Sequence, residues 1–263
     1  MELRTPAMTW KTVVADALRQ LGGEAHLSEI NEVIEGHSKT TTNPTWRDTI
    51  RRVVRQYNIF EPVPPDRSGI YRLVETEIPR PQPQNLDSAE PTINHGIAQG
   101  MLVAVGATYG YETFVPKTDQ TTQKFQGKKL GQLVSIDDCT SIFKGPNVAQ
   151  IREIDVLWLS EDEYGPYPVY GFEVEHTTRI RNGLDRLLKI PRRFNAEMFI
   201  LGPNDEQKEL FERRIVQAPF RAHQHRFRFR LYSQLEQLYN SVIQHASSRD
   251  AFGLVEQYRR LVI

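Results

Sequence analysis

The chain has 263 residues, 39% of them hydrophobic, and its 33 Lys and Arg residues balance 33 Asp and Glu residues to a formal net charge of zero. This length is sufficient for one or two hydrophobic cores. Because the net charge is zero, a nucleic-acid partner cannot be inferred from the overall charge of the chain. Any such partner has to be inferred from local basic patches. The single cysteine, Cys139, excludes a disulfide framework and a cysteine-based zinc site.

No run of 18 apolar residues occurs in the sequence, and the N-terminus lacks the pattern of a secretory signal peptide. Together with the lone cysteine, these features predict a cytoplasmic protein without a membrane partner.

Residues 1–75 show the pattern of three short helices followed by a strand, a turn and a strand. The first helix is expected after Thr9 as N-cap, and the second after Ser28. The third is expected to hold Pro44 in its first turn. This order predicts a small helical domain with a β-hairpin at its end.

The third helix carries four arginines at spacings that predict one basic side: Arg47, Arg51, Arg52 and Arg55. A helix that lies in the major groove needs such a side, because Arg bridges phosphates or binds guanine in a bidentate way. The segment 10–73 resembles the HARE-type winged helix-turn-helix, which implies a DNA-recognition domain over residues 1–75. The alternative is a helix whose arginines are simply solvated.

Residues 76–91 contain four prolines and few hydrophobic residues, which predicts a semi-stiff linker. In the remaining part, residues 92–263, apolar runs of strand length alternate with helical patterns. This alternation predicts an α/β domain with a mixed central sheet flanked by helices.

Three acids interrupt two apolar runs of that second domain: Asp155 in the first, and Glu173 and Glu175 in the second. Burying an unpaired carboxylate costs several kcal/mol, so these groups need a partner, an ion or a strand end. Side chains two apart on a strand share a face, and a neighbouring strand can bring Asp155 beside Glu173 and Glu175. Mg²⁺ would remove their mutual repulsion. A charged edge hairpin with outward acids is the alternative.

The order Asp155, strand, turn, strand and Glu173-Val174-Glu175 resembles the active-site hairpin of the PD-(D/E)XK nucleases, whose fold is restriction-endonuclease-like. Segments 110–116 and 173–188 are similar to predicted nucleases of prokaryotic defence loci. The resemblance implies that Asp155, Glu173 and the carbonyl of Val174 bind Mg²⁺, and that Asp155, Glu173 and Glu175 are catalytic. Glu175 replaces the usual Lys. It therefore either accepts a proton from water or completes a second metal site.

Further candidates for DNA contact are basic residues near the acids. Lys124, Lys128 and Lys129 lie in the polar segment 117–131, which predicts either a phosphate clamp or an ordinary mobile loop. Arg179 and Arg186 are expected to orient the scissile phosphate. Glu112, at the start of the first strand, is a candidate for an additional acid, although a solvated glutamate is the simpler interpretation. His176 is expected to be structural, because strand alternation points it away from Glu175.

The pattern as a whole predicts a Mg²⁺-dependent, type II-like restriction endonuclease acting on double-stranded DNA. Two-strand cleavage favours a homodimer, and a companion DNA methyltransferase would act on the same site. Two alternatives stay open. One is a catalytically inactive DNA-binding or regulatory protein with a nuclease fold, and the other is a modification-dependent, type IV-like nuclease.

Overall fold

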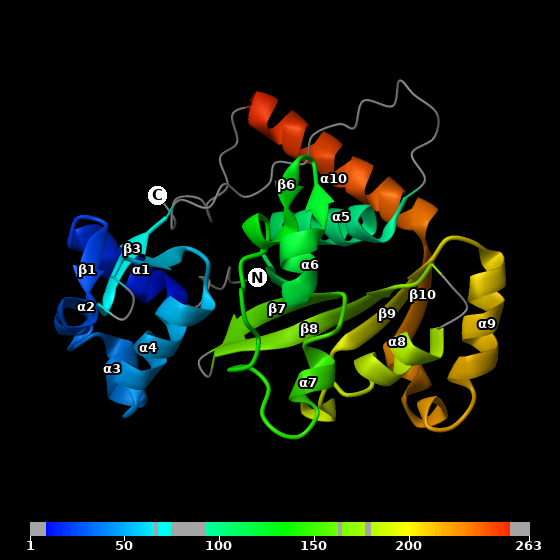
Figure 1. Cartoon of the computed structure of the whole chain (residues 1–263), viewed down its shortest axis with the longest axis horizontal. Helices are drawn as coiled ribbons and strands as arrows, with labels where there is room; N and C mark the ends of the chain where they lie inside the picture. The colour runs from blue at the N-terminus through cyan, green and yellow to red at the C-terminus, as the bar shows by residue number, and fades with distance from the viewer. Residues whose placement is uncertain (1–8, 66–67, 75–92, 163–164, 177–179, 253–263) are drawn as a thin grey trace, which may run out of the picture. The chain divides into compact units, whose positions relative to one another are not determined.

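A computed structural model describes residues 9–65, 68–74, 93–162, 165–176 and 180–252 (Figure 1). They fall into two compact units, one built around residues 9–74 and the other around residues 93–252. The expected linker at 76–91 lies outside the described residues.

The smaller unit packs helices on a three-stranded antiparallel sheet with the strand order β1-β3-β2. Its elements are α1 (Trp10–Gln20), β1 (Glu24–His26), α2 (Leu27–Ile34), α3 (Ser38–Thr42), α4 (Trp46–Gln56), β2 (Phe60–Pro62) and β3 (Ile70–Leu73). The expected helix starting after Thr9 is present, since the Thr9 hydroxyl accepts a hydrogen bond from the backbone N–H of Thr12 at 3.1 Å. The core forms where α1 packs on α2 and α4.

Two expected helix starts in this unit are wrong. The N-cap of α2 is His26 rather than Ser28, because the His26 imidazole accepts from the backbone N–H of Ser28 at 3.2 Å. Glu29 completes the capping box by accepting from the backbone N–H of His26 at 2.7 Å. Pro44 precedes α4 instead of occupying its first turn, since the helix begins at Trp46.

The larger unit is organised by a five-stranded sheet with the order β10-β9-β8-β7-β4. Its elements are α5 (His95–Thr108), β4 (Glu112–Phe114), α6 (Lys117–Thr122), β5 (Lys124–Phe125), β6 (Lys128–Lys129), α7 (Val148–Ile151), β7 (Val156–Asp162), β8 (Gly165–Val174), α8 (Ile180–Leu187), β9 (Glu197–Gly202), α9 (Asp205–Ile215), β10 (Phe227–Leu231) and α10 (Tyr232–Phe252). Strands β8, β9 and β10 are parallel, whereas β4 runs antiparallel to β7. The predicted mixed sheet flanked by helices is confirmed.

Helices α5 and α10 cover one face of this sheet, and α7, α8 and α9 lie on the other (Figure 1). Trp158 of β7 and Phe172 of β8 belong to the core beneath α5 and α10. The Trp158 indole N–H donates to the backbone carbonyl of Leu102 in α5 at 3.0 Å. A Cβ atom at Gly106 would lie 2.6 Å from the Trp158 indole nitrogen, so this glycine permits the close approach of helix and sheet.

Segment 117–131 is more ordered than a polar loop. It forms α6 and then the short β5–β6 hairpin, in which Lys124 pairs with Lys129. Phe125 anchors the hairpin, since its buried ring lies 5.8 Å from the ring of Tyr239 in α10. The alternation of exposed lysines with one buried aromatic residue explains why composition alone suggested a loop.

Cys139 provides a test of the core. Burial raises the pKa of its thiol to about 12, and neighbouring Asp138 adds to the rise. Since the thiolate is the reactive form, we expect Ellman's reagent at pH 8 to label the native chain at least about a hundredfold more slowly than the urea-unfolded chain. Labelling of the native chain at the unfolded rate would contradict this packing. Cys139 is the only cysteine, so the signal is unambiguous.

Candidate metal centre and active site

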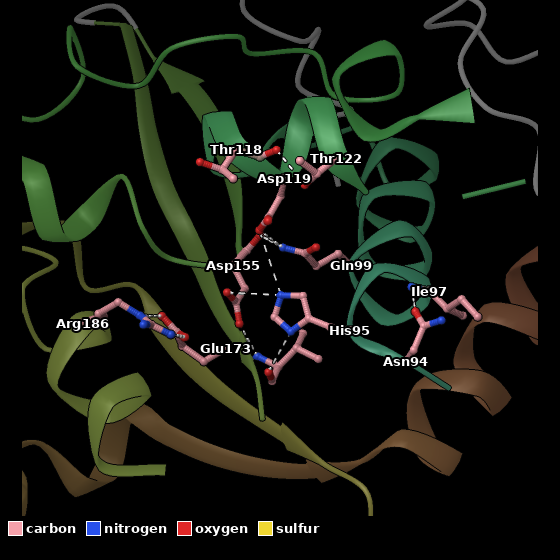
Figure 2. Close-up of polar contacts among 11 residues, drawn as sticks. Asn94, His95, Ile97, Gln99, Thr118, Asp119, Thr122, Asp155, Glu173 and Arg186 are labelled. Carbon is pink, nitrogen blue, oxygen red and sulfur yellow. Dashed lines mark hydrogen bonds and ion pairs between the residues drawn. The ribbon is translucent and has the colours of Figure 1, made fainter. Parts of the chain in front are cut away.

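Asp155 lies immediately before β7 rather than within it, and only 6% of its surface is exposed. Its Oδ2 accepts a hydrogen bond from the backbone N–H of Val174 at 2.7 Å, which joins the start of β7 to the end of β8 (Figure 2). Burial raises the pKa of Asp155, while His95 and the Val174 hydrogen bond oppose the rise. The carboxylate is thus fixed at a strand end.

Glu173 is fully buried, and Arg186 of α8 binds both of its carboxylate oxygens. The Arg186 Nε donates to Oε1 at 2.8 Å, and a terminal guanidinium nitrogen donates to Oε2. Figure 2 shows this pair pointing away from His95. Burial raises the pKa of Glu173 well above its usual range and Asp155 adds to this, whereas Arg186 lowers it. Arg186 therefore compensates a charge that would otherwise be buried without a partner.

Glu175 follows the end of β8 and is 8% exposed. Its carbonyl accepts from the Tyr232 hydroxyl at 2.9 Å, which ties it to the start of α10. A Cβ atom at Gly183 would lie 2.8 Å from Oε1 of Glu175 and 3.1 Å from Cβ of Glu173. The side chains of both acids therefore pack against α8 at Gly183. The absence of a side chain at this glycine leaves room for them.

The pKa of Glu175 is raised by burial first and by Asp155 second. Arg186, His95 and a backbone hydrogen bond from Gly183 oppose the rise. The pKa of this carboxyl group is thus shifted upward, towards the pH range in which a proton acceptor is most useful.

Two residues that sequence patterns did not single out complete the cluster. His95 is the first residue of α5, and Asp119 lies in the first turn of α6. Nε2 of His95 lies 3.6 Å from Oδ1 of Asp155 and 4.0 Å from Oδ2 of Asp119. One donor atom from each of these three residues lies within 4.8 Å of the others, so they form a candidate metal-binding group.

The sequence offered only a weak signal for this group. Asn94 caps α5 by accepting from the backbone N–H of Ile97 at 2.9 Å, which places His95 at the first helical position.

Glu112, weighed as an extra acid, pairs with Leu159, well along β7 from Asp155. Glu112 therefore lies away from the cluster, and Asp119 supplies the additional carboxylate.

The candidate DNA-contacting arginines of α4 are not equivalent. Arg47, Arg51 and Arg55 are exposed at spacings of four residues, whereas Arg52 is half-buried. Arg47 also pairs with Glu35 at 3.1 Å, and Arg51 pairs with Asp48 at 3.0 Å. Each of these two cations therefore already has an exposed acidic neighbour.

The other candidates for DNA contact are spread over the larger unit. Lys124, Lys128 and Lys129 are exposed on the β5–β6 hairpin, and Arg179 lies outside the described residues. His176 is exposed, with its ring 6.1 Å from that of His95 and 5.1 Å from that of Tyr232. The hairpin lysines and the acid cluster thus come from different elements of the same unit.

The fold and the cluster define an α/β domain with a candidate metal centre where β7 begins and β8 ends in a mixed sheet. Residues 77–252 match the model of the C-terminal domain of the type II restriction enzyme NmeDI, so the chain belongs to this restriction-enzyme family.

One relative is the type II restriction enzyme NmeDI of Neisseria meningitidis serogroup C, which is 24% identical over 195 residues. That alignment covers 69% of this chain and 52% of the relative, so the chain spans about half the length of the curated relative it matches. No solved structure matches the chain. None of the described helices has the length and apolar character needed to cross a membrane.

The ion pair of Glu173 and Arg186 is open to a direct test. We expect Arg186→Met to lower the free energy of unfolding by about 3 kcal/mol, because removing one partner of a buried pair leaves the other charge uncompensated. The double variant Glu173→Gln/Arg186→Met should recover much of that loss. Urea unfolding of the single and double variants measures both effects. Strictly additive losses would contradict a direct interaction.

Proposed function

We propose that this protein is a type II-like restriction endonuclease that hydrolyses phosphodiester bonds of double-stranded DNA with the help of a divalent cation. The observation that carries the proposal is the gathering of Asp155, Glu173 and Glu175 where β7 begins and β8 ends, inside the region that matches the restriction-enzyme family. The similarity to NmeDI, a type II restriction enzyme, supports the same class of activity.

The donors at this site fit a divalent cation. Carboxylate oxygens of Asp155 and Asp119 suit a hard ion, and their side chains approach one another around His95. A bound ion would supply positive charge to the scissile phosphate and lower the pKa of a coordinated water. Of the ligands expected from sequence, Asp155 faces this cluster, whereas Glu173 would have to be released by Arg186 before it bound an ion.

Glu175 is the candidate proton acceptor. Burial and the charge of Asp155 raise its pKa towards neutral pH. General bases work best when their pKa lies near the operating pH. Gly183 lies against both Glu175 and Glu173, so α8 holds the two acids in place. A role in a second metal site remains the alternative for Glu175.

We also propose that the smaller unit is a winged helix that recognises DNA. The order of helix, strand, helices and terminal hairpin, with β3 between β1 and β2, supports this proposal. The row of Arg47, Arg51 and Arg55 would lie on DNA phosphates or base edges.

In the larger unit, Lys124 lies opposite Lys129, a pair of like charges that a phosphate backbone would stabilise. Cutting both strands favours a homodimer, with a methyltransferase acting on the same DNA site.

Substitution of the acids tests the chemistry. We expect Asp155→Asn and Glu173→Gln to reduce plasmid cleavage by at least about a hundredfold, because the first weakens a proposed ion ligand and the second leaves the Arg186 charge uncompensated beside the site. Affinity for the same DNA should change little, as measured by fluorescence anisotropy in Ca²⁺. His176→Ala is the matched control and should cleave normally. Wild-type rates in Asp155→Asn would remove the assignment.

Substitution of the α4 arginines tests DNA recognition. Arg51→Ala with Arg55→Ala should weaken DNA binding and reduce the slope of log affinity against log salt by about 2, since each lost phosphate contact accounts for about one unit. Arg213→Ala is the control, because Arg213 is an exposed α9 residue paired with Glu209. An unchanged slope in the double variant would return α4 to a structural role.

Two observations favour a second candidate function. Arg186 occupies both oxygens of Glu173, and the position of the usual catalytic Lys holds Glu175, as a DNA-binding protein without cleavage activity would tolerate. A plasmid digest with and without EDTA separates this candidate from the endonuclease. Comparing methylated with unmethylated plasmid then separates a modification-dependent nuclease from one paired with a methyltransferase.

A further inference from the structure

The orientation of His95 is fixed by the end of β8. Its Nδ1 lies 3.2 Å from the carbonyl oxygen of Val174. When Nδ1 carries the proton and donates to this carbonyl, Nε2 keeps its lone pair. Nε2 is the atom that faces Asp155 and Asp119 (Figure 2). The backbone therefore selects the tautomer of His95 that can bind a cation.

The separations between donors suit an ion better than direct hydrogen bonds. Nε2 of His95 is 3.6 Å from Asp155 and 4.0 Å from Asp119, beyond the range of about 2.7–3.2 Å for an N–H···O bond. Two donors that bind one ion at about 2.1 Å each lie between about 3.0 and 4.2 Å apart, as the geometry of octahedral coordination requires. Both separations from Nε2 of His95 thus match those of two donors that share one divalent cation.

Each carboxylate in this group has a second partner that holds it in place. The Gln99 side-chain amide donates to Oδ2 of Asp119 at 2.8 Å and to the backbone carbonyl of Asp155 at 3.1 Å. The Val174 N–H holds Oδ2 of Asp155. Asp155 is more than nine-tenths buried, and among the described residues its Oδ1 accepts no hydrogen bond and faces His95. Outer contacts of this kind orient metal ligands in proteins.

We propose that Nε2 of His95, Oδ2 of Asp119 and Oδ1 of Asp155 bind a divalent transition-metal ion, while Glu173 stays paired with Arg186. Imidazole nitrogen suits first-row transition ions such as Fe²⁺, Ni²⁺ and Zn²⁺, with affinity rising along the row from Mn²⁺, whereas Mg²⁺ and Ca²⁺ favour oxygen ligands. The site therefore selects Mn²⁺ and its neighbours over Mg²⁺. The use of this ion in DNA cleavage rests on the proposed endonuclease function, but its binding does not.

Mn²⁺ titration of the full chain without DNA tests the site. The electron paramagnetic resonance signal of free Mn²⁺ reports the bound fraction. We expect one tight site in the wild type, with Mg²⁺ competing at least about tenfold more weakly. His95→Ala and Asp119→Asn should each weaken Mn²⁺ binding at least about tenfold, and Gln99→Leu by about 10–100-fold.

His176→Ala is the matched control, because its ring lies 6.1 Å from that of His95 but outside the three-residue group. It should keep wild-type affinity for Mn²⁺. Urea unfolding confirms that each variant is folded. Absence of a tight Mn²⁺ site in the wild type, or wild-type affinity in folded His95→Ala, would overturn the proposal.

Cleavage assays with the same variants separate the two proposals. Tight Mn²⁺ binding that depends on His95, without DNA cleavage in any metal, keeps the metal site and defeats the endonuclease function. Cleavage by His95→Ala at the wild-type rate, together with unchanged Mn²⁺ affinity, keeps the endonuclease and defeats the metal site.

Discussion

The hydrogen bond between the Val174 backbone N–H and the Asp155 carboxylate holds the candidate site together. It fixes an almost fully buried acid at the point where β7 begins and β8 ends. The carbonyl of the same Val174 lies against Nδ1 of His95, so one residue of the sheet orients both an acid and an imidazole. Because an unsatisfied buried carboxylate is costly, this hydrogen bond stabilises the adjoining ends of β7 and β8 as well as the site.

Charge is divided between two groups around the end of β8. Glu173 is neutralised by Arg186 of α8, whereas Asp155 and Asp119 surround His95 of α5 (Figure 2). The first group stabilises the packing of α8 on the sheet. The second has oxygen and nitrogen donors that converge without being hydrogen-bonded to one another. This division explains how several acids can lie in one small region without a compensating lysine.

Sequence reasoning located Asp155, Glu173 and Glu175 because carboxylates in apolar runs are conspicuous, and it predicted the mixed sheet from the alternation of strands and helices. It did not find His95, Asp119 or Gln99. These residues lie on α5 and α6, where polar side chains are ordinary, and only the tertiary fold brings them to Asp155. The pairing of Arg186 with Glu173 was missed for the same reason. The sequence pattern of a helix does not show whether an arginine on it binds a phosphate or a buried glutamate. Local capping by His26 depends on an imidazole orientation that composition does not encode.

The hydrogen bond from the Tyr232 hydroxyl to the carbonyl of Glu175 has a consequence for chain synthesis. Strands β9 and β10 also follow the acids in sequence, and both are needed before the parallel half of the sheet is complete. Such non-local pairings form slowly compared with local helices. A chain still emerging from the ribosome therefore lacks the support of its acids until Tyr232 has been translated, which delays any activity of the nascent polypeptide.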